Sequence, residues 1–348
     1  MDAARPSGIT GDLAEQRAVA ADRSAPLAER LEAFDDIVDS EVGDTTMARA
    51  RNLERDSGLR QIWVKFDGGN PTGTQKDRIA FAQVRDALRR GFEEVTVATC
   101  GNYGAALALA ASMAGVGCRV YVPHLYHTRR IEEMESAGAR LVRVEGDYEA
   151  AGAASSAAAS AEELYDANPG GANASLQLDA YAEIAGEIYD ELRDAPAAVA
   201  VPVSNGTTLA GIYKGFVRLY RRGRTSRMPR LVAGSASGKN PIVRAWLKDL
   251  EQCEDLDPEA IRETAINEPL INWHAFDGEL ALEAIRDTDG WAGYSSDREM
   301  VRSSRWLREQ EGLSILPAST AGLSVLLARH ASEGLPGDRY VAVLTGRR

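Results

Sequence analysis

The sequence predicts an α/β protein with two open, twisted and mostly parallel sheets, each with helices on both faces. Short β-branched apolar runs recur along the 348 residues, and amphipathic helical patterns stand between them. The runs are continuous rather than alternately polar and apolar, which is typical of parallel strands that are buried on both faces. At about 150 residues per domain, the length predicts two domains.

The expected strands and helices alternate in order. Several of the expected helices end in a glycine, the usual stop signal. The Ala-rich tract 149–167 favours a helix over a linker, and residues 1–25 lack periodicity and are expected to fray. The strands are predicted at 61–67, 93–99, 118–123, 139–145, 197–203, 230–236 and 339–346, and the helices at 77–91, 104–117, 128–138, 149–167 and 178–194.

The amino-acid composition argues against some classes of binding partner. A net charge of −12 and a pI of about 5.0 argue against nucleic acid and anionic membranes, since both require a basic surface. No apolar stretch approaches the roughly 18 residues of a membrane span, and no signal peptide is recognisable, so we expect a cytoplasmic protein. The three cysteines have no CxxC spacing, so neither a disulfide framework nor a metal site is expected.

Lys76 stands between a Gly/Pro/Thr-rich loop and a long helical pattern, in the segment KFDGGNPTGTQKDRIAFAQVRDAL (65–88). Only 5 of the 40 basic residues are lysine, which makes each one informative. A lysine at a helix start is usually a solvated residue. Here the helix macrodipole disfavours its charge and is expected to lower its pKa. A neutral amine is what a Schiff-base lysine requires.

Two further strand–turn–helix connections are rich in small residues. In VATCGNYGAALALAASMAG (97–115) the backbone could approach a planar ligand and Asn102 offers an amide donor, although a tight structural connection explains the same pattern. In VPVSNGTTLAGIYKGF (201–216) the backbone N–H groups and the hydroxyls of Ser204, Thr207 and Thr208 suit a phosphate. Neither the Walker A pattern nor G-x-G-x-x-G is present, so nucleotide binding is not indicated.

Together these segments resemble the pyridoxal-phosphate enzymes of fold type II, the tryptophan synthase β-like family, and within it the threonine synthase-like enzymes. The similar motifs extend from about residue 40 to the C-terminus. They are NPTGTQKDR (70–78), TCGNYGAALA (99–108), PVSNGTTLAGI (202–212), INEPLINW (266–273), EGLSILPASTAGLSVL (311–326) and YVAVLTG (340–346).

The resemblance implies a role for each matching residue. Lys76 would bind pyridoxal 5′-phosphate as a Schiff base and act as the catalytic base, and Asn102 would donate to the cofactor's 3′ oxygen. Thr345 would face the pyridine nitrogen. The substrate α-carboxylate would bind at the helix start formed by Thr99, Cys100, Gly101, Asn102 and Tyr103, and the cofactor phosphate would bind to Ser204, Asn205, Gly206, Thr207 and Thr208.

The implied reaction is elimination or replacement at the β or γ carbon of an amino acid. The first hypothesis is a threonine synthase-like lyase of the EC 4.2.3 type acting on O-phosphohomoserine. The alternatives are a cysteine or cysteate synthase-type β-replacement enzyme using O-phosphoserine or O-acetylserine, then a serine/threonine dehydratase. A degenerate paralogue without activity is the non-enzyme alternative. A hydroxyl rather than a carboxylate at the ring nitrogen favours elimination and replacement over transamination.

Three departures from the family pattern bear on the substrate. Gln75 precedes the lysine where threonine synthases usually have Phe, and TQKDRIA is equally close to a cysteine synthase motif. Segment 124–138 lacks the lysines that hold the substrate phosphate in threonine synthases, so Arg130 is a candidate anion ligand. An exposed arginine at the start of a helix is an equally good interpretation. Glu268 brings a carboxylate into the motif at 266–273.

The resemblance also implies a domain arrangement and an assembly. The larger domain is expected at 1–79 and 191–348 and the smaller at 80–190, with the cofactor in the cleft between them. Relatives of this fold are commonly homodimers, so we expect one. No role is assigned to His124, His127 or His274, and no metal is expected.

Overall fold

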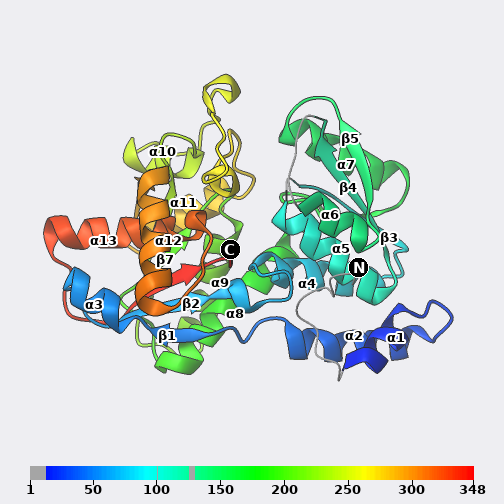
Figure 1. Ribbon diagram of the computed structural model, residues 1–348, viewed down its shortest axis with the longest axis horizontal. Helices are drawn as coiled ribbons and strands as arrows, with labels where there is room; N and C mark the ends of the chain where they lie inside the picture. Colours follow the sequence, from blue (N-terminus) through cyan, green and yellow to red (C-terminus); the bar gives the residue numbers. More distant parts are fainter. Residues whose placement is uncertain (1–12, 100, 125–129) are drawn as a thin grey trace. The chain divides into compact units, whose positions relative to one another are not determined.

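Contacts divide the chain into two units in the computed structural model, which describes residues 13–99, 101–124 and 130–348. The first unit comprises Met1–Gly43 and Asn70–Ala180, and the second comprises Asp44–Gly69 and Tyr181–Arg348. Both contain a sheet with helices packed on it, as Figure 1 shows for each unit taken alone. No described helix is both long enough and apolar enough to cross a membrane.

The first unit contains a four-stranded parallel sheet in the order β5-β4-β3-β6. Helix α7 packs on β3 and β4, and α5 packs on β4 and more extensively on α4. The strands are β3 (Glu94–Ala98), β4 (Gly117–Pro123), β5 (Arg140–Val144) and β6 (Tyr165–Asp166). The helices are α1 (Ala14–Ala21), α2 (Leu27–Glu41), α4 (Lys76–Arg89), α5 (Asn102–Ala114), α6 (Arg130–Ser136) and α7 (Tyr148–Ala161), with the start of α8 (Ala174–Leu192).

The second unit contains a six-stranded sheet in the order β1-β2-β10-β7-β8-β9, in which only β1 is antiparallel to its neighbour. Its strands are β1 (Met47–Arg49), β2 (Ile62–Phe66), β7 (Ala198–Pro202), β8 (Arg230–Ala236), β9 (Trp291–Ser295) and β10 (Tyr340–Leu344). Its helices are α3 (Arg51–Ser57), the rest of α8, α9 (Thr207–Arg221), α10 (Pro241–Leu247), α11 (Gly278–Asp287), α12 (Asp297–Glu311) and α13 (Ala321–Glu333). Short 3₁₀ turns occur at Asp67–Gly69, Pro258–Ala260, Glu268–Leu270 and Pro317–Thr320.

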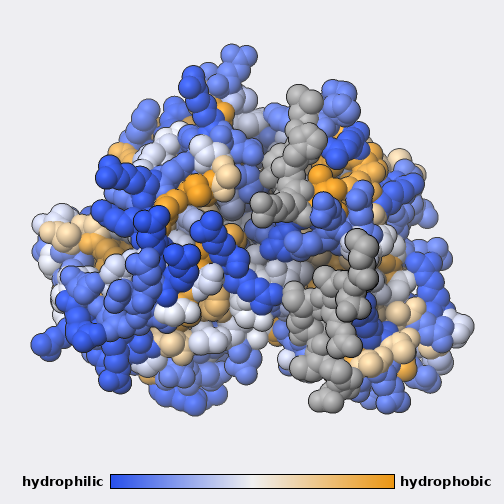
Figure 2. Space-filling model, viewed as in Figure 1, coloured by the Kyte–Doolittle hydropathy of each residue, from blue (hydrophilic) through white to orange (hydrophobic). Residues whose placement is uncertain are grey.

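Both faces of the central strands of this sheet are covered. Ala198 and Ala200 belong to a core cluster that also contains Leu323 of α13. Val199 and Val201, which point to the opposite face because side chains alternate along a strand, are also fully buried. The seven predicted strands and the α/β class are therefore confirmed. In the view of Figure 2 the surface of each unit is largely hydrophilic, as expected when apolar side chains fill these cores.

The N-terminal helices pack against the first unit rather than the second. The rings of Phe34 and Phe81 stack with centroids 5.8 Å apart, and Arg30 donates to the carbonyl of Ala114 at 2.7 Å. These contacts group residues 13–43 with α4 and α5, whereas the domain bounds expected from the sequence place them with the C-terminal half. Ala20, in the stretch expected to fray, is fully buried within α1.

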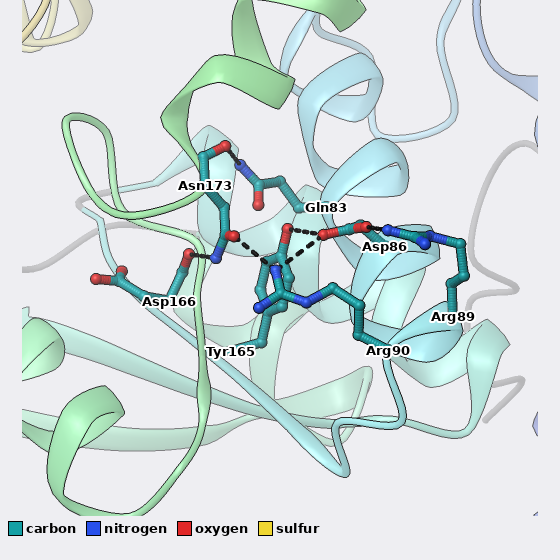
Figure 3. A network of polar contacts seen from close by, with 7 residues as sticks. All are labelled: Gln83, Asp86, Arg89, Arg90, Tyr165, Asp166 and Asn173. Atoms are coloured by element: carbon teal, nitrogen blue, oxygen red, sulfur yellow. Dashed lines mark hydrogen bonds and ion pairs between the residues drawn. The ribbon is translucent and has the colours of Figure 1, made fainter.

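A polar network holds the C-terminal half of α4 to the rest of the first unit (Figure 3). Its centre is Asp86, whose carboxylate pairs with Arg89 and Arg90 and accepts from the buried Tyr165 hydroxyl at 3.1 Å. Asn173 extends the network, since its side chain accepts from Arg90 at 2.8 Å and donates to the carbonyl of Asp166 at 2.8 Å. The helix that begins at Lys76 is thereby anchored at its far end.

Candidate active site

Lys76 is the first residue of α4, at the helix start that the sequence predicts. Its backbone N–H donates to the Thr74 hydroxyl at 3.2 Å, and its side chain is half-buried. The Lys76 Nζ atom lies 5.7 Å from the centroid of the Tyr103 ring, at the start of the neighbouring helix α5. Lys76 and the start of α5 therefore lie together because α4 and α5 pack against each other.

The loop before Lys76 is held by two charged side chains that meet at Thr72. The Asp77 carboxylate accepts from the Thr72 N–H at 3.0 Å and from its hydroxyl at 2.9 Å. Arg130 donates to the carbonyl of Thr72 at 3.2 Å and pairs with Glu133. Asp77 is completely buried, and this burial raises its pKa to about 7. The sequence analysis did not identify Asp77, although it lies in the motif around the lysine.

Thr99 and the first residues of α5 pack closely. The Thr99 hydroxyl accepts from the N–H of Gly101 at 3.2 Å, and a Cβ added to Gly104 would lie 2.5 Å from the Thr99 methyl group. Asn102 begins the helix and is half-buried. Tyr103 is buried, and its hydroxyl donates to the carbonyl of Ala167 at 2.8 Å. Cys100 lies outside the described residues.

The segment Ser204–Thr208 connects β7 to α9 in the second unit. Its first two carbonyl groups accept hydrogen bonds from residues distant in sequence. The Ser204 carbonyl accepts from the Asn240 amide at 2.9 Å, and the Asn205 carbonyl accepts from the Asp277 N–H at 3.0 Å. Among the described residues, none accepts a hydrogen bond from the backbone N–H groups at 206–209. These donors stand at the start of a 15-residue helix, an arrangement that suits an anion.

Gly206 allows this turn. Its φ of +91° lies in the left-handed region, and a Cβ there would lie 2.8 Å from both the Ala281 Cβ and the Asp277 carbonyl oxygen. The Thr207 hydroxyl donates to the Asp277 carboxylate. One of the hydroxyls expected from the sequence to bind a phosphate is therefore already hydrogen-bonded within the protein. The start of α9 is thereby fixed against the first turn of α11.

Thr345 follows β10, the strand next to β7 in the sheet. Its hydroxyl lies 3.0 Å from that of Ser319, and both residues are buried. The segment after it pairs with residues 314–316, since Leu316 donates to the carbonyl of Gly346 and Arg348 donates to that of Ser314. The carboxyl ends of β7 and β10 thus carry the loop Ser204–Thr208 and Thr345 on the same edge of one sheet.

The predicted site residues fall into two sets, one in each unit. Thr99, Gly101, Asn102, Tyr103, Lys76 and Arg130 belong to the first, and Ser204, Asn205, Gly206, Thr207, Thr208 and Thr345 belong to the second. Sequence reasoning missed Ser319, Asn240, Asn272 and Asp277, which support the second set from distant positions. The Asn-Pro pair at 240–241 is a helix-start signal that could have drawn attention to Asn240.

The residues without an assigned role lie in ordinary surroundings. His274 contacts the Asp255 carboxylate at 2.8 Å and is partly exposed, as is His124, which lies 3.8 Å from Glu145. Glu268 begins a 3₁₀ turn next to the buried Asn267. His127 lies outside the described residues. Among the described residues, no three His, Cys, Asp or Glu side chains cluster as metal ligands would.

Comparison with known proteins gives a consistent match. A family model described as "Pyridoxal-phosphate dependent enzyme" matches residues 38–346. The threonine synthase of Methanocaldococcus jannaschii is 31% identical over 314 residues, which cover 87% of this chain and 74% of that protein. The threonine synthase of a Bacillus species is 29% identical, covering 87% of this chain and 82% of that protein.

Solved structures agree at the level of the fold. Maize serine racemase superimposes with a TM-score of 0.75 at 15% identity, covering 91% of this chain and 93% of that one. O-ureido-L-serine synthase superimposes with a TM-score of 0.69 at 21% identity, covering 89% and 91%. At these identities the likeness establishes a shared fold.

Proposed function

The chain belongs to the pyridoxal-phosphate-dependent enzyme family, and from this premise we propose that it is a threonine synthase-like enzyme acting on O-phosphohomoserine. Its cofactor is pyridoxal 5′-phosphate and its class is carbon–oxygen lyase. The observation that carries the substrate proposal is the match of 87% of the chain to threonine synthases at 28–31% identity.

The residues present fit the cofactor. Its phosphate requires hydrogen-bond donors, and the unused N–H groups at 206–209 supply them at a helix start. We assign the phosphate to Ser204–Thr208, the aldehyde carbon to the Lys76 amine, the ring nitrogen to the Thr345 hydroxyl and the 3′ oxygen to Asn102. Each of these residues lies at the end of a strand or at the start of a helix within its own unit, which suits the role assigned to it.

When bound, the cofactor supplies an electron-withdrawing ring that stabilises negative charge at the substrate Cα. The neutral Lys76 amine would take up the Cα proton and one Cβ proton and would return protons to Cγ and Cα. The N–H groups at the start of α5 bind the substrate carboxylate, with Thr99, Gly101, Asn102 and Tyr103 around it. The balance requires loss of phosphate from Cγ, addition of water at Cβ, and transfer of one proton from Cβ to Cγ. Thr345 would face the ring nitrogen with a hydroxyl, which brings no negative charge.

The alternative with a specific observation behind it is β-replacement on O-phosphoserine or O-acetylserine. Gln75 precedes Lys76 in place of the aromatic residue usual in threonine synthases, and TQKDRIA is equally similar to a cysteine synthase motif. We also propose that the substrate is phosphorylated, that the enzyme is a homodimer and that it functions in the cytoplasm.

Phosphate release separates these functions. We expect the purified enzyme to release phosphate from O-phosphohomoserine without any sulfur nucleophile and to form threonine. Release only from O-phosphoserine, and only when sulfide or sulfite is added, would show that the β-replacement alternative is correct. Formation of ammonia and a keto acid in place of threonine would identify a dehydratase.

A further inference from the structure

Asn240 fixes one end of a chain of side-chain amides in the second unit. It is fully buried, and its Oδ1 accepts from the backbone N–H groups of Ile242 at 3.1 Å and Val243 at 3.2 Å. Only the carbonyl oxygen of an amide accepts hydrogen bonds, so these two donors determine which end of the side chain is which. The Nδ2 group of Asn240 must therefore point the other way.

The orientation of the Asn240 amide fixes the orientation of the Asn272 amide. Asn240 Nδ2 donates to the carbonyl of Ser204 at 2.9 Å and to Asn272 Oδ1 at 3.1 Å. Asn272 Nδ2 in turn donates to the carbonyl of His274 at 2.6 Å and to Asn205 Oδ1 at 3.1 Å. The backbone carbonyls of Ser204 and His274 confirm the orientation independently, because a carbonyl accepts only from an amide nitrogen.

The last member of this chain is Asn205, in the loop before α9. Because its Oδ1 accepts from Asn272, its Nδ2 group points away from Asn272. Among the described residues none accepts a hydrogen bond from that group, and Asn205 is half-buried. We propose that Asn240 and Asn272 are positioning residues that orient the Asn205 amide so that its NH₂ group binds the cofactor phosphate.

This inference rests on the proposed binding of the phosphate at Ser204–Thr208. A phosphate carries acceptors and negative charge, so it gains from an NH₂ group and is repelled by an amide oxygen. Without Asn272, the Asn205 side chain could present either end. The orientation therefore adds selectivity for the phosphorylated cofactor, and we expect it to be worth about tenfold in affinity, as for one hydrogen bond to a charged group.

The test compares two probes on the full chain freed of cofactor: pyridoxal 5′-phosphate and pyridoxal, which lacks the phosphate. Asn205→Ala is expected to weaken binding of the phosphorylated probe about tenfold and to leave pyridoxal binding unchanged. Asn272→Ala is expected to act in the same direction. Because Asn272 acts through Asn205, the double variant should be no weaker than Asn205→Ala alone.

Two further variants keep the test decisive. Asn272→Val is of similar size, cannot donate to Asn205 and adds no charge that would itself repel a phosphate, so it replaces Asn272→Ala if that variant does not fold. Asn267→Ala is the matched control, since Asn267 is also buried and its amide bonds Thr264 and Asp297, outside the chain of asparagines. It should leave the ratio of the two affinities unchanged.

The failures are distinguishable. If Asn205→Ala leaves the ratio unchanged, this inference is wrong, whereas binding of the phosphate by the backbone N–H groups at 206–209 is not contradicted. If Asn205→Ala lowers the ratio but both Asn272 variants do not, the loop assignment stands and the orienting role is overturned. Equal losses for both probes in the Asn272 variants would show a purely structural role and would also overturn it.

Discussion

The carboxylate of Asp77 accepts two hydrogen bonds from Thr72, at 3.0 Å from the amide nitrogen and at 2.9 Å from the hydroxyl. Both end on Oδ2, and Oδ1 has no partner among the described residues. Burial raises the pKa of this carboxyl from its ordinary 3.8 to about 7. The loop that leads into Lys76 is thus closed by a group that titrates near neutral pH.

Asp77 is expected to make stability depend on pH. Its folded-state pKa of about 7 lies above the unfolded value, so the folded protein holds the proton more tightly. The stability from this group is complete below about pH 4 and is lost as the pH rises toward 7. Because an amide resembles the protonated acid, Asp77→Asn should remove this dependence of stability on pH. Urea unfolding of wild type and Asp77→Asn across that range measures it, and parallel pH profiles would refute the assignment.

Arg130 is expected to position the loop before Lys76. Arg130→Ala removes the hydrogen bond to the Thr72 carbonyl, so kcat/KM for O-phosphohomoserine should fall about tenfold, through kcat rather than KM. Glu133→Gln, which changes the carboxylate that pairs with Arg130, should stay near wild type. Steady-state kinetics that separate kcat from KM measure this. A rise in KM with kcat unchanged would instead support the anion-binding role considered from the sequence.

Gly206 is expected to be irreplaceable for two separable reasons. Gly206→Ala places an L residue at φ +91° and its Cβ 2.8 Å from α11, whereas Gly223→Ala has φ +64° and open space. The left-handed backbone costs each variant about 1 kcal/mol, and the close contact adds about 1–3 kcal/mol only at Gly206. The free energies of unfolding in urea measure the difference. Equal losses for the two variants would mean that α11 moves aside.

The hydroxyl of Thr345 is expected to favour elimination. Thr345→Asp would place a carboxylate at the ring nitrogen, which holds a proton there and favours transamination. We expect phosphate release to fall at least about tenfold, which corresponds to 1.4 kcal/mol in the barrier, with amination of the cofactor visible in the absorbance spectrum. Thr345→Ser, which keeps the hydroxyl, should retain most activity. Normal phosphate release by the Asp variant would contradict this role.

Much of the fold follows from local sequence. The seven predicted strands are continuous apolar runs, and their burial on both faces is why no alternation is visible. Strand β9 escaped prediction because WAGYS has no β-branched residue and contains Gly293, whose position against Val325 leaves little room for a side chain. Strands β1 and β6 have three and two residues, too few for a periodic pattern.

The candidate site is likewise predictable only in part from the local sequence. Lys76 and the turn before α9 have local signals, a helix start after a small-residue loop. Their supports come from afar: Asn272 is 67 residues from Asn205, and Asp277 is 70 residues from Thr207. Nothing in the sequence near these residues indicates which loop they contact, because that depends on how α9, α10 and α11 pack. The role of Asp77 likewise depends on burial, which one sequence does not reveal.

Reduction of the enzyme with borohydride, followed by peptide mass spectrometry, tests the central claim most directly. Borohydride makes a Schiff base permanent, and the chain offers five lysines at 65, 76, 214, 239 and 248. We predict that the cofactor's mass is found on the peptide at Lys76 and that Lys76→Ala carries no label and no visible absorbance band. A label on another lysine, or a bound cofactor in Lys76→Ala with the wild-type spectrum, would contradict the account.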